Sequence, residues 1–302
     1  MLFGGIYELW PDPLVVGAMG VKELDHALSQ PGVEVVLYWP AWNWTLRTIP
    51  ALLEAKWRAI RLRKRLIFMV NSIPQQRLLR RFGLTAHLAS LNCFVDENVF
   101  RIESSPKRFD ALYIAQMLPV KRMFLARDIP SIYVVTYGEC RDQAGGYDLH
   151  RFEPTLAHAN FNRGWLGAAQ IARLINECRV NLALSAEEGA MLAVVEGLLC
   201  GVPLVSTPCR GGRELFFDSR FVEIADPTPQ AVAAAVSRLS RADVPRELIR
   251  RETLRRLQAH RTAVGNVVAG AVGDLRGSPV KEGDVSARFF GGKGTAAHFI
   301  GF

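Results

Sequence analysis

The sequence predicts an α/β protein built from parallel β-sheets and organised in two domains. Short apolar runs, of the kind that form buried strands, alternate with segments of helical composition. This alternation is interrupted once by a polar stretch and then starts again. With 302 residues, 49% hydrophobic and 22% charged, the chain is long enough for two modest globular domains.

The first domain is expected over residues 1–104 and is short. Its predicted elements are strands at 33–39 and 66–70, helices at 46–65 and 74–81, and a short apolar run at 85–93. They form one β-α-β unit extended into a small parallel sheet. The polar residues 96–107 then predict a linker.

The second domain is expected over residues 105–245. Its predicted elements are strands at 111–117, 131–137, 180–185, 203–206 and 221–224, and helices at 122–127, 165–178, 189–200 and 229–239. This rhythm specifies a doubly wound parallel sheet, which binds ligands at the carboxyl ends of its strands. Residues 246–302 form a last segment, a basic helix to about residue 262 followed by a glycine-rich tail. The run Gly291–Thr295 does not satisfy the phosphate-loop pattern.

Basic residues are concentrated in one part of the first domain. The net charge is +8, and the segment from Lys56 to Arg81 holds nine basic residues and no acid. One interpretation is a solvated helix face; the alternative is attraction to an anionic bilayer or a lipid-phosphate acceptor. Nucleic acid is not an expected partner, because no zinc finger, helix-turn-helix or aromatic RNA-binding signature occurs.

The sequence predicts a cytoplasmic protein, with possible contact at the inner face of the membrane. The longest stretch without charged residues, Phe82–Val95, is shorter than the roughly 18 to 20 apolar residues of a membrane span. Residues 1–10 lack the pattern of a secretory signal. The five cysteines are scattered and never spaced as C-x-x-C, so reduced thiols are expected rather than disulfides or a zinc site. No metal and no other cofactor is expected.

The segment 184–207 carries the most chemical information. It reads as a strand, an acidic turn, a helix from Gly189, a glycine stop and a second strand, with Glu188 and Glu196 separated by seven residues. On one helix the two carboxylates would be spread over roughly 12 Å. Because a carboxylate accepts hydrogen bonds from two neighbouring hydroxyls, Glu188 is expected to hold a hexose and Glu196 a ribose diol. The expected helix start at Gly189 and Ala190 would direct N–H groups at a diphosphate.

This order of residues resembles the retaining glycosyltransferases of family 4, the group 1 glycosyltransferases. The family's E-x7-E is matched by Glu188 and Glu196, its G-x-P turn by residues 201–203, and its G-G-x-x-E by residues 211–214. The resemblance implies a GT-B-like fold of two Rossmann-like domains, here with an abbreviated N-terminal one. It also implies metal-independent transfer, with retention, from a nucleotide sugar to a hydroxyl on a glycan, lipid-linked or small-molecule acceptor.

A second resemblance lies at residues 114–122, which align with the family's G-R-L-x-x-x-K. Lys121 matches the lysine that holds the donor diphosphate, but Gln116 stands where the family has arginine. An amide supplies no charge, so we expect slower chemistry or compensation by an arginine. The resemblance implies catalytic roles for Lys121 and Glu188. The implied donor-binding set is Gln116, Lys121, Glu188, Gly189, Ala190, Met191, Glu196, Gly211 and Gly212, with Arg122, Arg210, Arg213, Glu214 and His158 as auxiliary candidates.

The short first domain leaves alternatives open. The family's acceptor domain is longer, and Gly4–Gly5 resembles its glycine-rich loop only weakly. The acceptor site is therefore reduced, displaced or completed by a partner, or the chain is truncated. The rival functions are a non-catalytic nucleotide-sugar-binding protein and a nucleotide-sugar epimerase or hydrolase on the same fold. A dinucleotide-binding protein is disfavoured, because no strand precedes a G-x-G-x-x-G.

Overall fold

The computed structural model describes residues 6–40 and 42–290. The chain divides into two compact units. The first unit comprises residues 1–96, 211–215 and 256–302, and the second comprises 97–210 and 216–255. The first division falls after Asp96, at the start of the expected linker. The glycine pairs at 4–5 and 291–292 lie outside the described residues.

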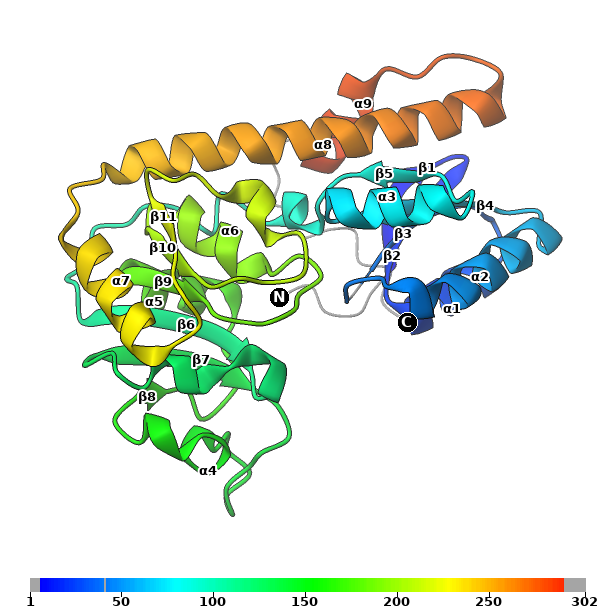
Figure 1. Ribbon diagram of the computed structural model, residues 1–302. Coiled ribbons are helices and arrows are strands. Elements are labelled where there is room, and N and C mark those ends of the chain that lie inside the picture. The colour runs from blue at the N-terminus through cyan, green and yellow to red at the C-terminus, as the bar shows by residue number, and fades with distance from the viewer. Residues whose placement is uncertain (1–5, 41, 291–302) are drawn as a thin grey trace. The chain divides into compact units, whose positions relative to one another are not determined.

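The first unit contains a five-stranded sheet in the order β1-β2-β3-β4-β5 (Figure 1). Its strands are β1 (Ile6–Pro11), β2 (Leu14–Met19), β3 (Val33–Trp39), β4 (Arg65–Val70) and β5 (Ala86–Leu88). All neighbours are parallel except β1, which pairs antiparallel with β2. The hairpin of β1 and β2 and the helix that follows it precede the first strand that the sequence predicts.

One face of this sheet is covered by the helices that connect its strands. The helical segments of the first unit are α1 (Val21–Ser29), η1 (Leu46–Thr48), α2 (Ile49–Arg61), α3 (Ile73–Arg81), η2 (Leu91–Phe94), η6 (Arg213–Phe216, whose last residue belongs to the second unit) and α9 (Glu282–Phe290). The core contains Leu28 of α1, Leu52 of α2 and Leu79 of α3, packed with Val36 and Phe68 of the sheet. Alternate residues along each strand point to opposite faces, so these three helices share one face.

The second unit contains a six-stranded, fully parallel sheet in the order β11-β10-β9-β6-β7-β8. Its strands are β6 (Phe109–Gln116), β7 (Ile132–Tyr137), β8 (Asn160–Phe161), β9 (Cys178–Ala183), β10 (Leu204–Ser206) and β11 (Val222–Ile224). Its helical segments are η3 (Pro119–Lys121), η4 (Met123–Ala126), α4 (Leu149–Phe152), η5 (Pro154–Leu156), α5 (Ala168–Asn176), α6 (Leu192–Leu199) and α7 (Pro229–Arg241). The predicted α/β class with parallel, Rossmann-like sheets is confirmed.

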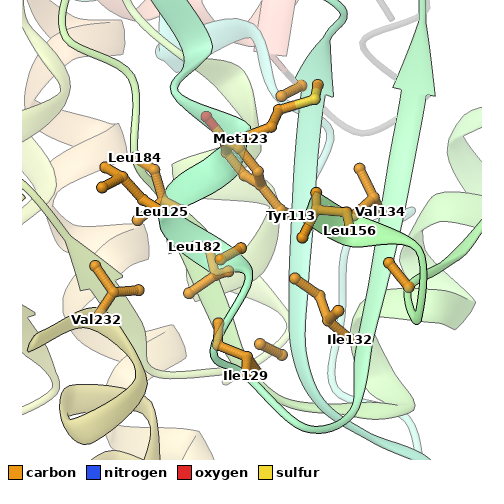
Figure 2. Close-up of a cluster of buried hydrophobic side chains, with 14 of the residues drawn as sticks. Tyr113, Met123, Leu125, Ile129, Ile132, Val134, Leu156, Leu182, Leu184 and Val232 are labelled. Carbon is orange, nitrogen blue, oxygen red and sulfur yellow. The ribbon is translucent and has the colours of Figure 1, made fainter. Parts of the chain in front are cut away.

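A cluster of aliphatic side chains forms one core of the second unit (Figure 2). Val134 of β7 and Leu182 of β9 are fully buried there, together with Leu125 of η4 and Val232 of α7. Tyr113 of β6 is also fully buried, and its hydroxyl donates a hydrogen bond to the carbonyl oxygen of Lys121 at 2.6 Å. The core therefore fixes the backbone of η3, in the loop that follows β6.

The helix α8 (Arg246–Arg276) is longer than the sequence predicts and contributes residues to both units. Close packing explains why it continues past residue 262: a Cβ on Gly265 would lie 2.8 Å from the Glu282 carboxylate, and one on Gly273 would lie 3.3 Å from the Ser278 carbonyl. Glycine is thus used here for contact with the following segment rather than to end the helix. In the described residues, no helix is long and apolar enough to cross a membrane.

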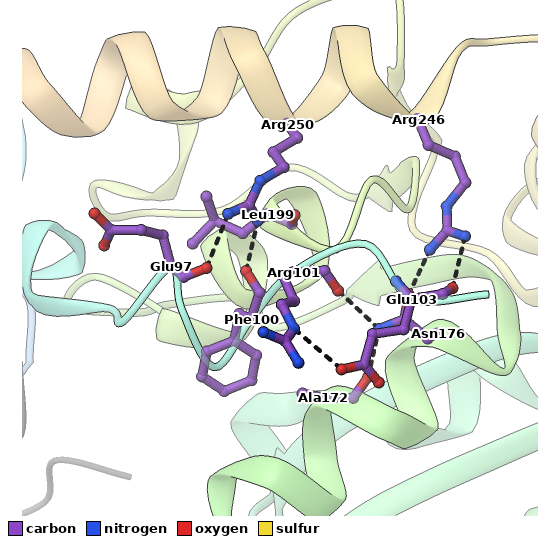
Figure 3. A network of polar contacts seen from close by, with 9 residues as sticks. All are labelled: Glu97, Phe100, Arg101, Glu103, Ala172, Asn176, Leu199, Arg246 and Arg250. Carbon is purple, nitrogen blue, oxygen red and sulfur yellow. Dashed lines mark hydrogen bonds and ion pairs between the residues drawn. The ribbon is translucent and has the colours of Figure 1, made fainter. Parts of the chain in front are cut away.

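Two arginines of α8 fix the segment that enters the second unit (Figure 3). Arg250 donates to the carbonyl oxygens of Glu97, Phe100 and Leu199, each at 2.7 or 2.8 Å. Arg246 donates to the carbonyls of Glu103 and Cys200 and to Asn176. Because the last carbonyls of a helix have no partner within it, these guanidinium groups also cap the carboxyl end of α6.

The contact between α6 and β9 requires glycine at position 197. A Cβ there would lie 2.2 Å from Nδ2 of Asn181, which donates to the carbonyl oxygen of Ala193 at 2.8 Å. We expect Gly197→Ala to lower the free energy of unfolding by about 3 kcal/mol, because overpacking must displace the helix or the amide. The helical Gly270 is the matched control, since its Cβ would meet no atom within 4 Å.

Gly270→Ala should be neutral or stabilise by about 0.5–1 kcal/mol through helix propensity. Denaturant titration of both variants measures the difference. Equal midpoints would show that α6 does not depend on the close approach.

Candidate functional site

The candidate site lies at the carboxyl edge of the second unit's sheet, where the loops after β6 and β9 meet. The N–H of Ala186 donates to the carbonyl of Val120 at 2.9 Å, which joins the two loops. The Glu188 N–H donates to the carbonyl of Arg210 at 2.9 Å, so the loop after β10 is attached as well. Three loops thus position Lys121 and Glu188, as expected for a doubly wound sheet.

A buried ion pair is the main feature of the site. Nζ of Lys121 lies 2.5 Å from Oε1 of Glu188, and the two side chains are only 10% and 8% exposed. A buried charge is costly unless it is paired, so the two groups hold each other in place. The structure therefore brings together the two residues for which catalytic roles were predicted.

Two non-glycine residues next to the pair have left-handed backbone conformations. Arg122 follows Lys121 with φ 49°, and Met191 lies three residues after Glu188 with φ 57°. Such strained residues cost on the order of 1–3 kcal/mol and concentrate at functional sites. Here they turn the chain sharply after each member of the ion pair.

The prediction that α6 begins at Gly189 is wrong. Gly189 and Ala190 lie in the loop before the helix, which starts at Leu192 after the left-handed Met191. Glu188 is therefore held by the loop and its bond to the Arg210 carbonyl, and only Glu196 lies on the helix. The two glutamates therefore do not lie two turns apart on one helix. The expected spread of roughly 12 Å, which assumed a single helix, does not apply.

Glu196 is a buried carboxyl group on α6, 5% exposed. Within the described part of the chain, no hydrogen-bond donor reaches its carboxylate. Burial raises its pKa from 4.5 to about 7. A buried acid that no donor of the described residues reaches is suited to accept hydrogen bonds from a ligand.

This pKa makes stability depend on pH. The folded state binds the proton of Glu196 more tightly than the unfolded state, so stability is expected to fall as pH rises from about 4.5 and to level off above about 7. The full effect is roughly 3 kcal/mol. Thermal unfolding of the ligand-free protein across this range checks it. Glu196→Gln should flatten that part of the profile, and an unchanged slope would remove Glu196 as its source.

Tyr137 is a site residue that the sequence analysis missed. It ends β7 and pairs with Gln116 at the end of β6. Burial and the negative charges of Glu188 and Glu196 raise the pKa of its hydroxyl, which places it near both carboxylates. Its ring meets Trp165, 57% exposed, edge to face at 6.2 Å. The position of Tyr137 at the end of a predicted strand was the signal that could have identified it.

The auxiliary residues of the second unit have different placements. Arg122 donates to Thr207 Oγ1 at 2.8 Å and to the carbonyls of Leu184 and Pro208, so it braces the loops of the site. Arg210 pairs with Glu187 at 2.7 Å on the surface. His158 donates to the carbonyl of Ile129, before β7 begins, and so lies at the amino edge of the sheet, away from Lys121.

Residues 211–214, which match the G-G-x-x-E pattern, belong to the first unit. A Cβ on Gly212 would lie 1.8 Å from the Asn71 carbonyl oxygen, so no other residue fits there. Arg213 is fully buried and Glu214 is exposed. Their roles toward a donor stay predictions. In the described ranges, no three His, Cys, Asp or Glu side chains gather where they could hold a metal ion.

Comparisons with known proteins agree with this fold. Residues 113–242 match the family model described as "Glycosyl transferases group 1". No curated protein sequence matches the chain.

Solved structures match at low sequence identity. HepE from Anabaena, in complex with UDP, has 13% identity and a TM-score of 0.59, over 82% of this chain and 81% of that one. The pneumococcal O-GlcNAc transferase GtfA, in complex with UDP and GlcNAc, has 15% identity and a TM-score of 0.54, over 83% and 57%. Sucrose-phosphate synthase from Thermosynechococcus elongatus has 15% identity and a TM-score of 0.52, over 74% and 63%. The chain thus has the GT-B fold, with a group 1 glycosyltransferase domain matched over residues 113–242.

Proposed function

We propose that this protein is a retaining, metal-independent glycosyltransferase that moves a sugar from a nucleoside diphosphate to an acceptor hydroxyl. The buried Lys121–Glu188 pair, in the domain that matches the family, is the observation that carries the proposal. The buried ion pair, together with the buried acid Glu196 on the helix that follows Glu188, suits a substrate with a diphosphate and several hydroxyls.

Each group has a role in this reaction. When the bond between the anomeric carbon and the diphosphate breaks, negative charge develops on the leaving group, and Lys121 stabilises it. Glu188 orients both the ammonium group and the sugar hydroxyls. Glu196 accepts hydrogen bonds from the ribose diol. The first-turn N–H groups of α6 add a positive partial charge toward the diphosphate.

The neutral Gln116 makes a binding protein without turnover the second candidate. The guanidinium of Arg122 is bonded to carbonyl groups and a hydroxyl, and that of Arg210 pairs with Glu187. In the second unit, Lys121 therefore has to compensate for the arginine that the family has at the position of Gln116. This arrangement favours slow chemistry. Gln116→Arg would supply the charge.

The test is mass spectrometry of the protein incubated with nucleotide sugars and with glycan, lipid-linked and small-molecule acceptors, with and without EDTA. UDP-sugars come first, because HepE and GtfA are seen with UDP. A glycoside that forms equally in EDTA is the expected product. Loss of donor without any glycoside would identify a hydrolase or epimerase, and binding without loss would identify the second candidate.

A further inference from the structure

Helix α2 of the first unit has apolar residues on two sides. Ile49, Leu52, Ala55 and Ala59 are buried against the sheet. A helix that packs on a sheet needs a buried apolar face of this kind. The exposed sides of a surface helix are normally polar.

A second side of the segment, which flanks the buried side and is exposed, is apolar as well. Leu46 (65% exposed), Leu53 (43%), Trp57 (57%) and Ile60 (61%) follow one another at steps of seven, four and three residues. At 3.6 residues per turn they line one side of the segment η1–α2. We call these four residues the apolar stripe. A tryptophan and three large aliphatic side chains so exposed on one helix side indicate an interaction surface.

Cations outnumber acids in the part of the chain that carries the stripe. Residues 41–95 contain ten lysines and arginines and one acid, Glu54. The guanidinium of Arg61 lies over the Trp57 ring, 4.6 Å from its centroid. Arg47 and Arg63 are exposed.

The lysines of the same region have structural partners instead. Nζ of Lys56 donates to the carbonyl of Leu66 at 2.7 Å, and Nζ of Lys64 donates to that of Gln30 at 2.5 Å. Burial lowers the pKa of both. The exposed charge of the surface therefore comes from arginines.

We propose that the apolar stripe is a docking surface for an anionic lipid bilayer. A helix lying in the plane of the interface places Trp and aliphatic side chains at the acyl boundary and long cationic side chains at the phosphates, which is the chemistry found here. A second copy of the chain is a poor occupant, because a self-complementary contact would bring the same cations together. This surface lies in the first unit and does not depend on the donor site of the second.

The experiment is co-sedimentation of the full chain with vesicles of phosphatidylcholine alone or mixed with phosphatidylglycerol. Binding is expected only to the mixed vesicles. It should weaken as salt rises from about 0.1 M to about 1 M, which shortens the Debye length from about 10 Å to about 3 Å. Replacing both Trp57 and Ile60 by serine should weaken binding about tenfold. Arg61→Gln should weaken it about fivefold.

Matched controls lie elsewhere on the surface. Trp165→Ser removes an equally exposed tryptophan, and Arg173→Gln removes an exposed charge from α5. Both should bind vesicles as the parent does. Far-ultraviolet circular dichroism verifies that all variants are folded.

The proposal is overturned if the mixed vesicles bind no better than phosphatidylcholine, or if the Trp57/Ile60 variant binds as well as the controls. A dimer in size-exclusion chromatography that dissociates in the Trp57/Ile60 variant would also overturn it, in favour of a second copy. None of these results depends on donor binding or turnover.

Discussion

Lys121→Met is expected to lose both turnover and stability. Turnover should fall about 100- to 1,000-fold, because the charge that stabilises the leaving diphosphate is gone. The free energy of unfolding should fall by about 3–5 kcal/mol, because Glu188 is left buried without its partner. Michaelis kinetics and denaturant titration measure the two effects.

A double variant separates the two losses. With both Lys121→Met and Glu188→Gln, no unpaired charge remains, so most of the stability should return while turnover stays lost. Arg108→Met is the control, since it breaks an ion pair with Glu177 whose arginine is 62% exposed. It should cost less than about 1 kcal/mol. If Lys121→Met lowers the free energy of unfolding no more than Arg108→Met does, the Lys121–Glu188 ion pair does not stabilise the fold as described.

Glu196→Gln is expected to weaken donor binding about tenfold to a hundredfold, because hydrogen bonds to a neutral amide are weaker than those to a carboxylate. The parent should also bind more tightly as pH rises. Its carboxyl has a pKa of about 7, and a diol that donates to the carboxylate selects the ionised form. Affinity therefore rises up to about pH 7 and then levels off.

Calorimetry in buffers of different ionisation enthalpy detects the proton that leaves on binding near pH 6. Glu196→Gln should abolish that release, and Glu223→Gln, on the surface ion pair with Arg238, should preserve it. If the proton is still released in the Glu196→Gln variant, a group other than Glu196 accepts the hydrogen bonds of the ribose diol.

The strands were the part of the fold most open to prediction. Residues 33–39 coincide with β3, and residues 66–70 and 131–137 each differ from β4 and β7 by one residue. Buried parallel strands are continuous apolar runs, so their signal is local. The opening hairpin of β1 and β2 was missed, because prolines and a glycine interrupt its apolar residues.

The errors at the site arise from contacts distant in sequence. Nothing local predicts the left-handed Met191 that delays α6. The loop before it is joined by backbone hydrogen bonds to Arg210, which is distant in sequence. The length of α8 depends on the approach of Glu282 to Gly265. The roles of Glu188 and Lys121 came from a family resemblance, and their direct contact appears only in the structure.

Titration calorimetry of UDP, GDP and ADP into the protein in EDTA tests the donor site most directly. We expect saturable binding of one nucleoside diphosphate, unchanged by removal of divalent metal, and weakened by Glu196→Gln but not by Glu223→Gln. Binding of none of the three, or binding that Glu196→Gln leaves unchanged, would contradict this expectation.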